Sequence, residues 1–250
     1  MHKYIALISL TLIYCSKSDE SDISTNNNLV NNEVGFVNSG KIYFENNTCK
    51  CPDASNGDKD IISGVTYTAV NNSSINDEIT NGNIYLCTTL VTNMSGTSVS
   101  SIFQNFFNNN SFNSNISFWD VSNVTNMDGM FYNADTFNQD ISNWNTSKVD
   151  NMGSMFKNAS SFNQDISNWN TSKVTKMLDL FRGASAFNQN ISNWDTSSAT
   201  SMSKMFENAT LFNQNISNWC VSNITEEPEN FSVNSPLLDS YKPMWGSCPE

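Results

Sequence analysis

The sequence has few of the side chains on which catalysis and nucleic-acid binding depend. Its only histidine is His2 and its only arginine is Arg182. Charged residues are 14% of the chain, and 24 acidic against 12 basic residues give a net charge of −12. The chain therefore has almost no imidazole that could act as a general base or bind a metal ion. It has no Gly-rich phosphate-binding motif, and its net negative charge would repel the phosphates of a nucleic acid. We predict a protein that is not an enzyme, with no metal, no cofactor and no nucleic-acid partner.

Neutral polar and large apolar residues take the place of charge. The chain has 42 Asn and 37 Ser, together with 16 Phe, 6 Trp and 10 Met. Disordered chains lack such large apolar groups. The sequence therefore predicts a folded protein that is polar through amides and hydroxyls.

The N-terminus has the pattern of a removable leader. Residues 1–14 hold a basic start and an apolar run of about ten residues, which is too short for a membrane span, and the run ends at Cys15. The leader resembles a bacterial lipoprotein signal, in which the cysteine is lipidated, and the acidic stretch after it resembles the export tag of surface-displayed lipoproteins. Tyr14 stands where such signals have a small residue, so an ordinary secretory signal is the alternative. We predict lipidation of Cys15, a flexible tether over 15–32, and a surface lipoprotein anchored in the outer membrane, with secretion as the alternative.

A 25-residue repeat dominates the rest of the chain. Tryptophans recur at this interval, at Trp119, Trp144, Trp169, Trp194 and Trp219, and Phe, Ile and Met keep the same interval. Within one unit, the apolar residues of 124–137 fall at offsets 0, 3, 6, 7, 10 and 13, which is the pattern of one helix face. Residues 141–144 are short and carry a branched and an aromatic side chain, which favours a strand. One unit is thus predicted to be strand, turn, helix, turn.

Such units form a solenoid, because one unit alone buries too little apolar surface to be stable. We predict a solenoid over 94–231, an N-terminal cap over 33–93 and a C-terminal cap over 232–250. The N-terminal cap is expected to be β-rich, since 40–44 and 64–70 alternate as strands do.

The repeat also resembles a known family. The unit from Phe137 to Ala159 is similar to the BspA-like leucine-rich repeat, the same repeat that is catalogued as a domain of unknown function in mycoplasma and flavobacterial surface proteins. The resemblance implies an α/β fold, a leucine-rich-repeat-like solenoid on a cell surface, and adhesion to host or matrix proteins.

Two sets of repeat positions are candidates for function or for stacking. One set consists of two asparagine columns, each of which predicts a structural ladder, with a ligand-binding polar face as the alternative. The first column is Asn143, Asn168, Asn193 and Asn218, and the second is Asn138, Asn163, Asn188 and Asn213. The other set differs from turn to turn while core positions do not, and it is the candidate binding surface: Asp128, Gly153, Leu178 and Ser203.

Apart from Cys15, five cysteines lie toward the ends of the array, and a secreted chain makes disulfides expected. We predict a Cys220–Cys248 disulfide that pins the C-terminal cap. A second disulfide joins Cys87 to one of Cys49 or Cys51, with Cys51 as our choice.

The leading hypothesis is a non-catalytic adhesion or protein-interaction module at the cell surface. Its partner would be an extracellular, host or matrix protein, or a glycan, and a lipid anchor would attach it to the membrane. The alternatives are a structural spacer or envelope component without a ligand, and a polysaccharide-binding protein. Polysaccharide binding predicts exposed aromatic side chains, whereas the aromatic residues of the repeat look buried.

Overall fold

The computed structural model of the protein describes residues 39–97, 100–101 and 112–249, all within one unit, Phe36–Glu250. The predicted leader, the tether and Cys15 lie outside these residues. No helix within them is long and apolar enough to cross a membrane.

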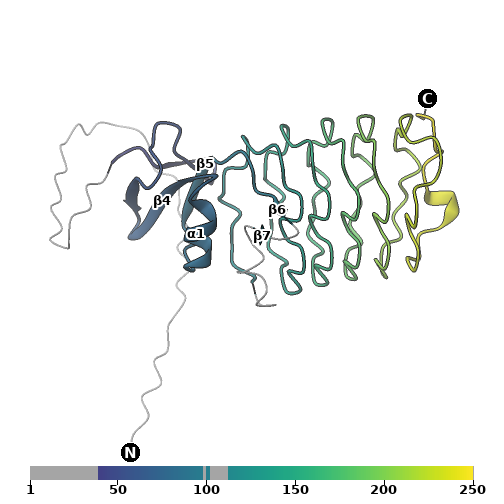
Figure 1. Ribbon diagram of the computed structural model, residues 1–250, viewed down its shortest axis with the longest axis horizontal. Helices are drawn as coiled ribbons and strands as arrows, with labels where there is room; N and C mark the ends of the chain where they lie inside the picture. The colour runs from purple at the N-terminus through teal and green to yellow at the C-terminus, as the bar shows by residue number, and fades with distance from the viewer. Residues whose placement is uncertain (1–38, 98–99, 102–111, 250) are drawn as a thin grey trace, which may run out of the picture. The chain divides into compact units, whose positions relative to one another are not determined.

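The N-terminal cap is built from five short strands and one helix (Figure 1). These are β1 (Tyr43–Glu45), β2 (Thr48–Lys50), β3 (Lys59–Ile62), β4 (Val65–Asn71), α1 (Ile75–Thr80) and β5 (Leu86–Leu90). Strands β1 and β2 form a hairpin around Asn46 and Asn47, which both have positive φ, as a two-residue hairpin turn requires. Strand β3 pairs antiparallel with β4, which pairs parallel with β5. Two further short strands, β6 (Gly96–Thr97) and β7 (Ser100–Ser101), follow the cap.

The predicted α/β fold class, a leucine-rich-repeat-like solenoid of strand-turn-helix units, is wrong. In the residues that the structure describes, α1 is the only α-helix, and the only other helical element is a 3-10 turn, η1 (Asp239–Tyr241). Residues 124–137 are a series of turns, and 141–144, the predicted strand, also turn. Among the described residues, the β-type pairing between the repeats consists of isolated parallel bridges, as between Asn126 and Asn151.

The three-residue spacing arises from tight turns. Met130 N–H donates to the carbonyl of Met127 at 3.1 Å, and Ala134 N–H donates to Phe131 at 3.1 Å, so the chain bends about every three residues. The residues between these turns bond outward, as Phe131 N–H does to the Met155 carbonyl of the next turn at 2.8 Å. Positive φ at Gly129 and at Asn133 interrupts any helix. The apolar side chains are therefore buried as a helix would bury them, while the backbone pairs between turns.

The core of the array consists of aligned aromatic columns. Phe131, Phe156 and Phe181 are fully buried and stack with ring centroids 5.4 and 5.7 Å apart. Three tryptophan indoles of the repeats donate to a carbonyl of the preceding turn, as the Trp169 Nε1–H does to the Ile141 carbonyl at 3.1 Å, whereas the Trp144 indole does not. Since equivalent residues of successive turns lie against each other, each turn covers the apolar face of its neighbour (Figure 1).

The C-terminal segment covers the last turn. Val221 N–H donates to Ser247 at 2.8 Å, and Gly246 N–H donates to Ile224 at 2.8 Å. Trp245 lies edge-on to Phe231, the last phenylalanine of its column, with ring centroids 5.0 Å apart. This segment thus shields the terminal aromatic ring.

Candidate functional site

The structure places the four predicted surface residues in one column across successive turns. Leu178 is 37% exposed, Asp128 and Ser203 are half-buried, and Gly153 is buried. A Cβ atom on Gly153 would lie 2.9 Å from Asp128 Oδ1 and 3.3 Å from Leu178 Cδ2. The side chains of the turns before and after therefore close over Gly153, and the column forms a continuous strip of surface.

Ion pairs that sequence reasoning missed flank this column. Asp179 accepts from Lys157 Nζ at 3.0 Å and lies 3.4 Å from Arg182. Arg182 Nε also pairs with Glu207 at 2.9 Å, so the network joins three successive turns. We call these four residues, together with the Asp128 column, the charged face. Their repeat positions also vary from turn to turn, and this variation is the signal that could have found them.

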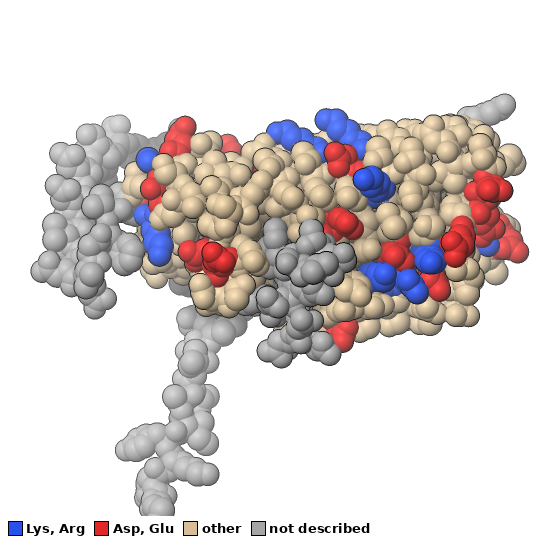
Figure 2. Space-filling view, viewed as in Figure 1, with Lys and Arg blue, Asp and Glu red and all other residues tan. Residues whose placement is uncertain are grey.

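The charged face consists of side chains that are held in place. Burial raises the pKa of the Asp128 carboxyl, and the nearby Asp179 raises it further, while Lys176 and Lys157 partly oppose the rise. Lys157 Nζ also lies 5.6 Å from the ring centroid of Tyr132. Figure 2 shows red and blue side chains lying against one another over the repeat turns, on a surface that is otherwise mostly uncharged. Such an arrangement can recognise a partner with complementary charges.

The asparagine columns differ in their bonding. The residues of the first predicted column are all exposed, and no side-chain hydrogen bond joins them to one another in the part of the chain that the structure describes: Asn143, Asn168, Asn193 and Asn218. The second predicted column does form a hydrogen-bonded ladder. Asn138 Oδ1 accepts from Asn163 N–H at 2.9 Å and from Gln164 Nε2 at 2.9 Å, and the pattern repeats in the following turns.

The predicted disulfides, Cys51–Cys87 and Cys220–Cys248, are both present. Cys49 is free and buried, and burial, with a smaller contribution from Asp120, raises the pKa of its thiol to about 12. No group of three or more His, Cys, Asp or Glu side chains could hold a metal ion within the described segments.

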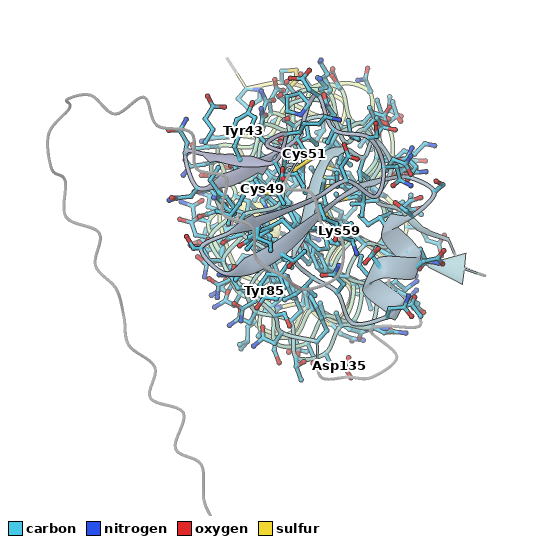
Figure 3. All side chains as sticks on the ribbon, turned by 90° about the vertical axis from the view of Figure 1, so that its left-hand side faces the viewer. Tyr43, Cys49, Cys51, Lys59, Tyr85 and Asp135 are labelled. Atoms are coloured by element: carbon cyan, nitrogen blue, oxygen red, sulfur yellow. A yellow bond between two sulfur atoms is a disulfide. The ribbon has the colours of Figure 1, made fainter. Side chains whose placement is uncertain are left out.

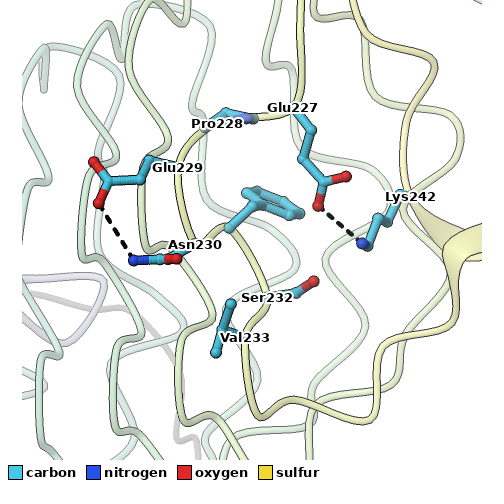
Figure 4. Close-up of a pocket in the computed structure, with 8 residues that line it drawn as sticks. Glu227, Pro228, Glu229, Asn230, Ser232, Val233 and Lys242 are labelled. Carbon is cyan, nitrogen blue, oxygen red and sulfur yellow. Dashed lines mark hydrogen bonds and ion pairs between the residues drawn. The ribbon is translucent and has the colours of Figure 1, made fainter.

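A shallow hollow of about 500 Å³ lies at the C-terminal end of the array (Figure 4). Its lining comes from the loop Glu227–Val233 and from Lys242. Lys242 Nζ is bound to Glu227 at 2.8 Å and to Asp239 at 2.9 Å, and its pKa is raised because these pairs outweigh its burial. The lysine of the hollow is therefore neutralised by the protein's own carboxylates.

Comparison with known families gives one match. The family model described as "Mycoplasma protein of unknown function, DUF285" matches twice, over residues 70–171 and 140–240. Neither curated proteins nor solved structures show a match. The two matches cover all the repeats described above and more than half of the chain, and the chain therefore belongs to this DUF285 repeat family.

Proposed function

We propose that the protein is a non-catalytic cell-surface lipoprotein that binds an extracellular or host protein through the charged face. The observation that carries the proposal is the contrast between the core and this face. The buried positions hold nearly the same residue types in successive turns, whereas the charged face presents Asp128, Leu178, Arg182 and Glu207 at positions that change from turn to turn. Folding requires that the buried positions stay similar from turn to turn, but it does not require the variation on the charged face.

Binding to matrix proteins tests this proposal directly. The full chain is immobilised, and a panel of purified matrix proteins is passed over it at low and high salt. Lys157→Glu should weaken binding at least about tenfold, because it removes the Asp179 ion pair and reverses a charge within the face. Lys173→Glu is the matched control, because it changes the net charge equally at an exposed position on another column of the repeat. Equal losses in both variants, or no binding partner in the panel, would refute the proposal.

The proposed anchor rests on Cys15 and the leader. Cell fractionation of the full-length protein and of Cys15→Ser tests it. The native chain should stay with the membrane and be accessible to protease added to intact cells. A Cys15→Ser protein that stays equally membrane-bound would contradict a lipid anchor at this residue.

A structural spacer is the second candidate, and a specific observation favours it. The ion pairs of the charged face are satisfied within the protein, as between Arg182 and Glu207. A spacer predicts that deleting the gene alters envelope integrity and leaves cell attachment unchanged, whereas a binding module predicts the reverse.

A further inference from the structure

Among the residues that the structure describes, the exposed aromatic side chains lie in the N-terminal cap. In residues 39–97 and 112–249 the exposed ones are Tyr43, Phe44 and Tyr85, which are 45%, 40% and 45% exposed. The phenylalanine and tryptophan columns of the repeats are buried. Large apolar groups that remain on the surface as a group commonly mark a site of interaction.

Phe44 and Tyr85 belong to a cluster of four rings, completed by the half-buried Tyr67 and Phe118. Tyr67 is at its centre, with ring centroids 5.2 Å from Phe44, 5.9 Å from Tyr85 and 5.8 Å from Phe118. The neighbouring rings stand at 76° to 89° to the Tyr67 plane, which is a favourable edge-to-face geometry. We call these four residues the aromatic cluster.

Tyr43 does not belong to the aromatic cluster although it precedes Phe44. Successive side chains of a strand point to opposite faces, so Tyr43 and Phe44 leave β1 on opposite sides. No ring among the described residues is in contact with Tyr43. Figure 3, which looks onto the cap, shows Tyr43 and Tyr85 well apart, with Cys49 between them.

Backbone hydrogen bonds and a disulfide hold the residues of the aromatic cluster in position. Phe44 pairs across the hairpin with Cys49, whose N–H donates to the Phe118 carbonyl at 2.8 Å. The adjacent Cys51 is joined by its disulfide to Cys87 of β5. A ligand would therefore meet rings that are already in place, which lowers the entropy cost of binding.

The charges around the aromatic cluster determine the chemistry of its ligand. Lys50 pairs with Asp120 at 3.0 Å, and Lys41 pairs with Asp58 at 3.0 Å, so these two lysines of the cap are neutralised internally. The chain carries a net charge of −12, which disfavours an anionic ligand. The cluster itself offers ring surfaces and the phenol hydroxyls of its two tyrosines, all uncharged.

We propose that the aromatic cluster is a binding site for a neutral polysaccharide. The C–H groups on the face of a sugar ring carry partial positive charge and are attracted to the negative face of an aromatic ring. The sugar hydroxyls can bond with the tyrosine hydroxyls, which fix orientation in an otherwise apolar site. This site is separate from the charged face and does not depend on the protein binding proposed above.

Affinity electrophoresis of the full chain in gels containing dextran, mannan, laminarin or xylan tests the proposal, with heparin as an anionic comparison. At least one neutral polysaccharide should retard the native chain. Phe44→Ala and Tyr85→Ala should each weaken its binding about tenfold or more. Tyr43→Ala is the matched control, because Tyr43 and Tyr85 are equally exposed. Thermal unfolding of each variant shows whether the cap is still folded.

Tyr85→Phe separates ring stacking from a loss of structure, because it keeps the ring, and it should bind within about threefold of the native chain. The proposal fails if no neutral polysaccharide retards the chain, if heparin alone does, or if Tyr43→Ala loses as much as Tyr85→Ala. Loss of binding in Tyr85→Phe equal to that in Tyr85→Ala refutes ring stacking. Sedimentation of the native chain is the last control: self-association that Phe44→Ala abolishes, without polysaccharide binding, would identify the cluster as an interface between two copies of the chain.

Discussion

Two asparagines of one turn provide a matched test of how neighbouring turns are held together. Asn163 Oδ1 accepts hydrogen bonds from Asn188 N–H at 2.9 Å and from Gln189 Nε2 at 3.0 Å, both in the next turn. Asn168, five residues later, is exposed and is not part of a hydrogen-bonded side-chain column. Asn163→Ala therefore removes two bonds between turns, and Asn168→Ala removes none of these.

The size of the effect follows from the exposure of these bonds. A hydrogen bond contributes about 0.5 to 1.5 kcal/mol net, and water replaces part of it at a surface, so Asn163→Ala should cost about 1 to 2 kcal/mol. With an m-value of about 3 kcal/mol/M, the urea midpoint falls by about 0.5 M. Asn168→Ala should change the free energy of unfolding by less than about 0.5 kcal/mol.

Urea unfolding followed by tryptophan fluorescence measures both variants. An unchanged m-value is needed, because a change would mean that the turns no longer unfold together. Equal costs for the two variants would refute the assignment of the ladder to the Asn163 column. A larger cost for Asn168→Ala would show that the Asn168 column holds the turns together.

Three further predictions concern the cysteines and one buried carboxylate. Replacing Cys220 and Cys248 by Ser should cost about 3 to 4 kcal/mol from the entropy of a loop with a sequence separation of 28, measured by calorimetry against the oxidised protein. The pKa of the Cys49 thiol is about 12 in the folded state and 9.0 for an ordinary thiol, so the unfolded chain loses this proton first as pH rises. The free energy of unfolding should therefore fall above pH 9.0, by at most about 1.4 kcal/mol per pH unit. Cys49→Ala should reduce this fall in urea melts measured over a series of pH values. Asp60 is buried, yet the pKa of its carboxyl is lowered, because hydrogen bonds from residues 39–42 outweigh the desolvation. The stabilisation by the Asp60 carboxylate is therefore present above the ordinary carboxyl pKa and is lost as pH falls. Asp60→Asn should lower the free energy of unfolding by on the order of 2 kcal/mol at pH 7 and make it depend less on pH under acidic conditions.

The sequence predicted which side chains are buried in the repeats and could not predict their backbone. Met127, Met130, Phe131, Ala134 and Phe137 are all buried, in agreement with the one-face pattern. A helix and a series of three-residue turns bury the same positions, and the difference lies in whether the N–H groups bond within the segment or with the next turn. Positive φ at non-glycine residues such as Asn133 excludes the helix and favours the turns. The sequence did not reveal these positions, because asparagine is only one of the residue types found there.

The two candidate binding regions differ in how visible they are in the sequence. The Asp128 column was visible because a repeat aligns it, and the same alignment contained the signal for Arg182. The aromatic cluster was not visible, because Phe44 and Tyr67 lie outside the repeat, whereas Phe118 lies within it, at the position that Asn143 takes one unit later. The fold alone brings them together, through hairpin pairing and the parallel pairing of β4 with β5.

The bonding between turns also bears on how such a chain can change in length during evolution. Phe131 bonds to Met155 and Phe156 bonds to Leu180 in the same manner, so a turn meets the same partners whichever neighbour follows it. Gain or loss of one whole 25-residue unit by recombination between repeats would rejoin equivalent bonds, whereas an insertion within a segment whose N–H groups bond to the next turn would break that local pairing. A chain with more or fewer units would therefore differ in the area of the charged face, while the aromatic cluster and the disulfide at the C-terminal end would stay the same.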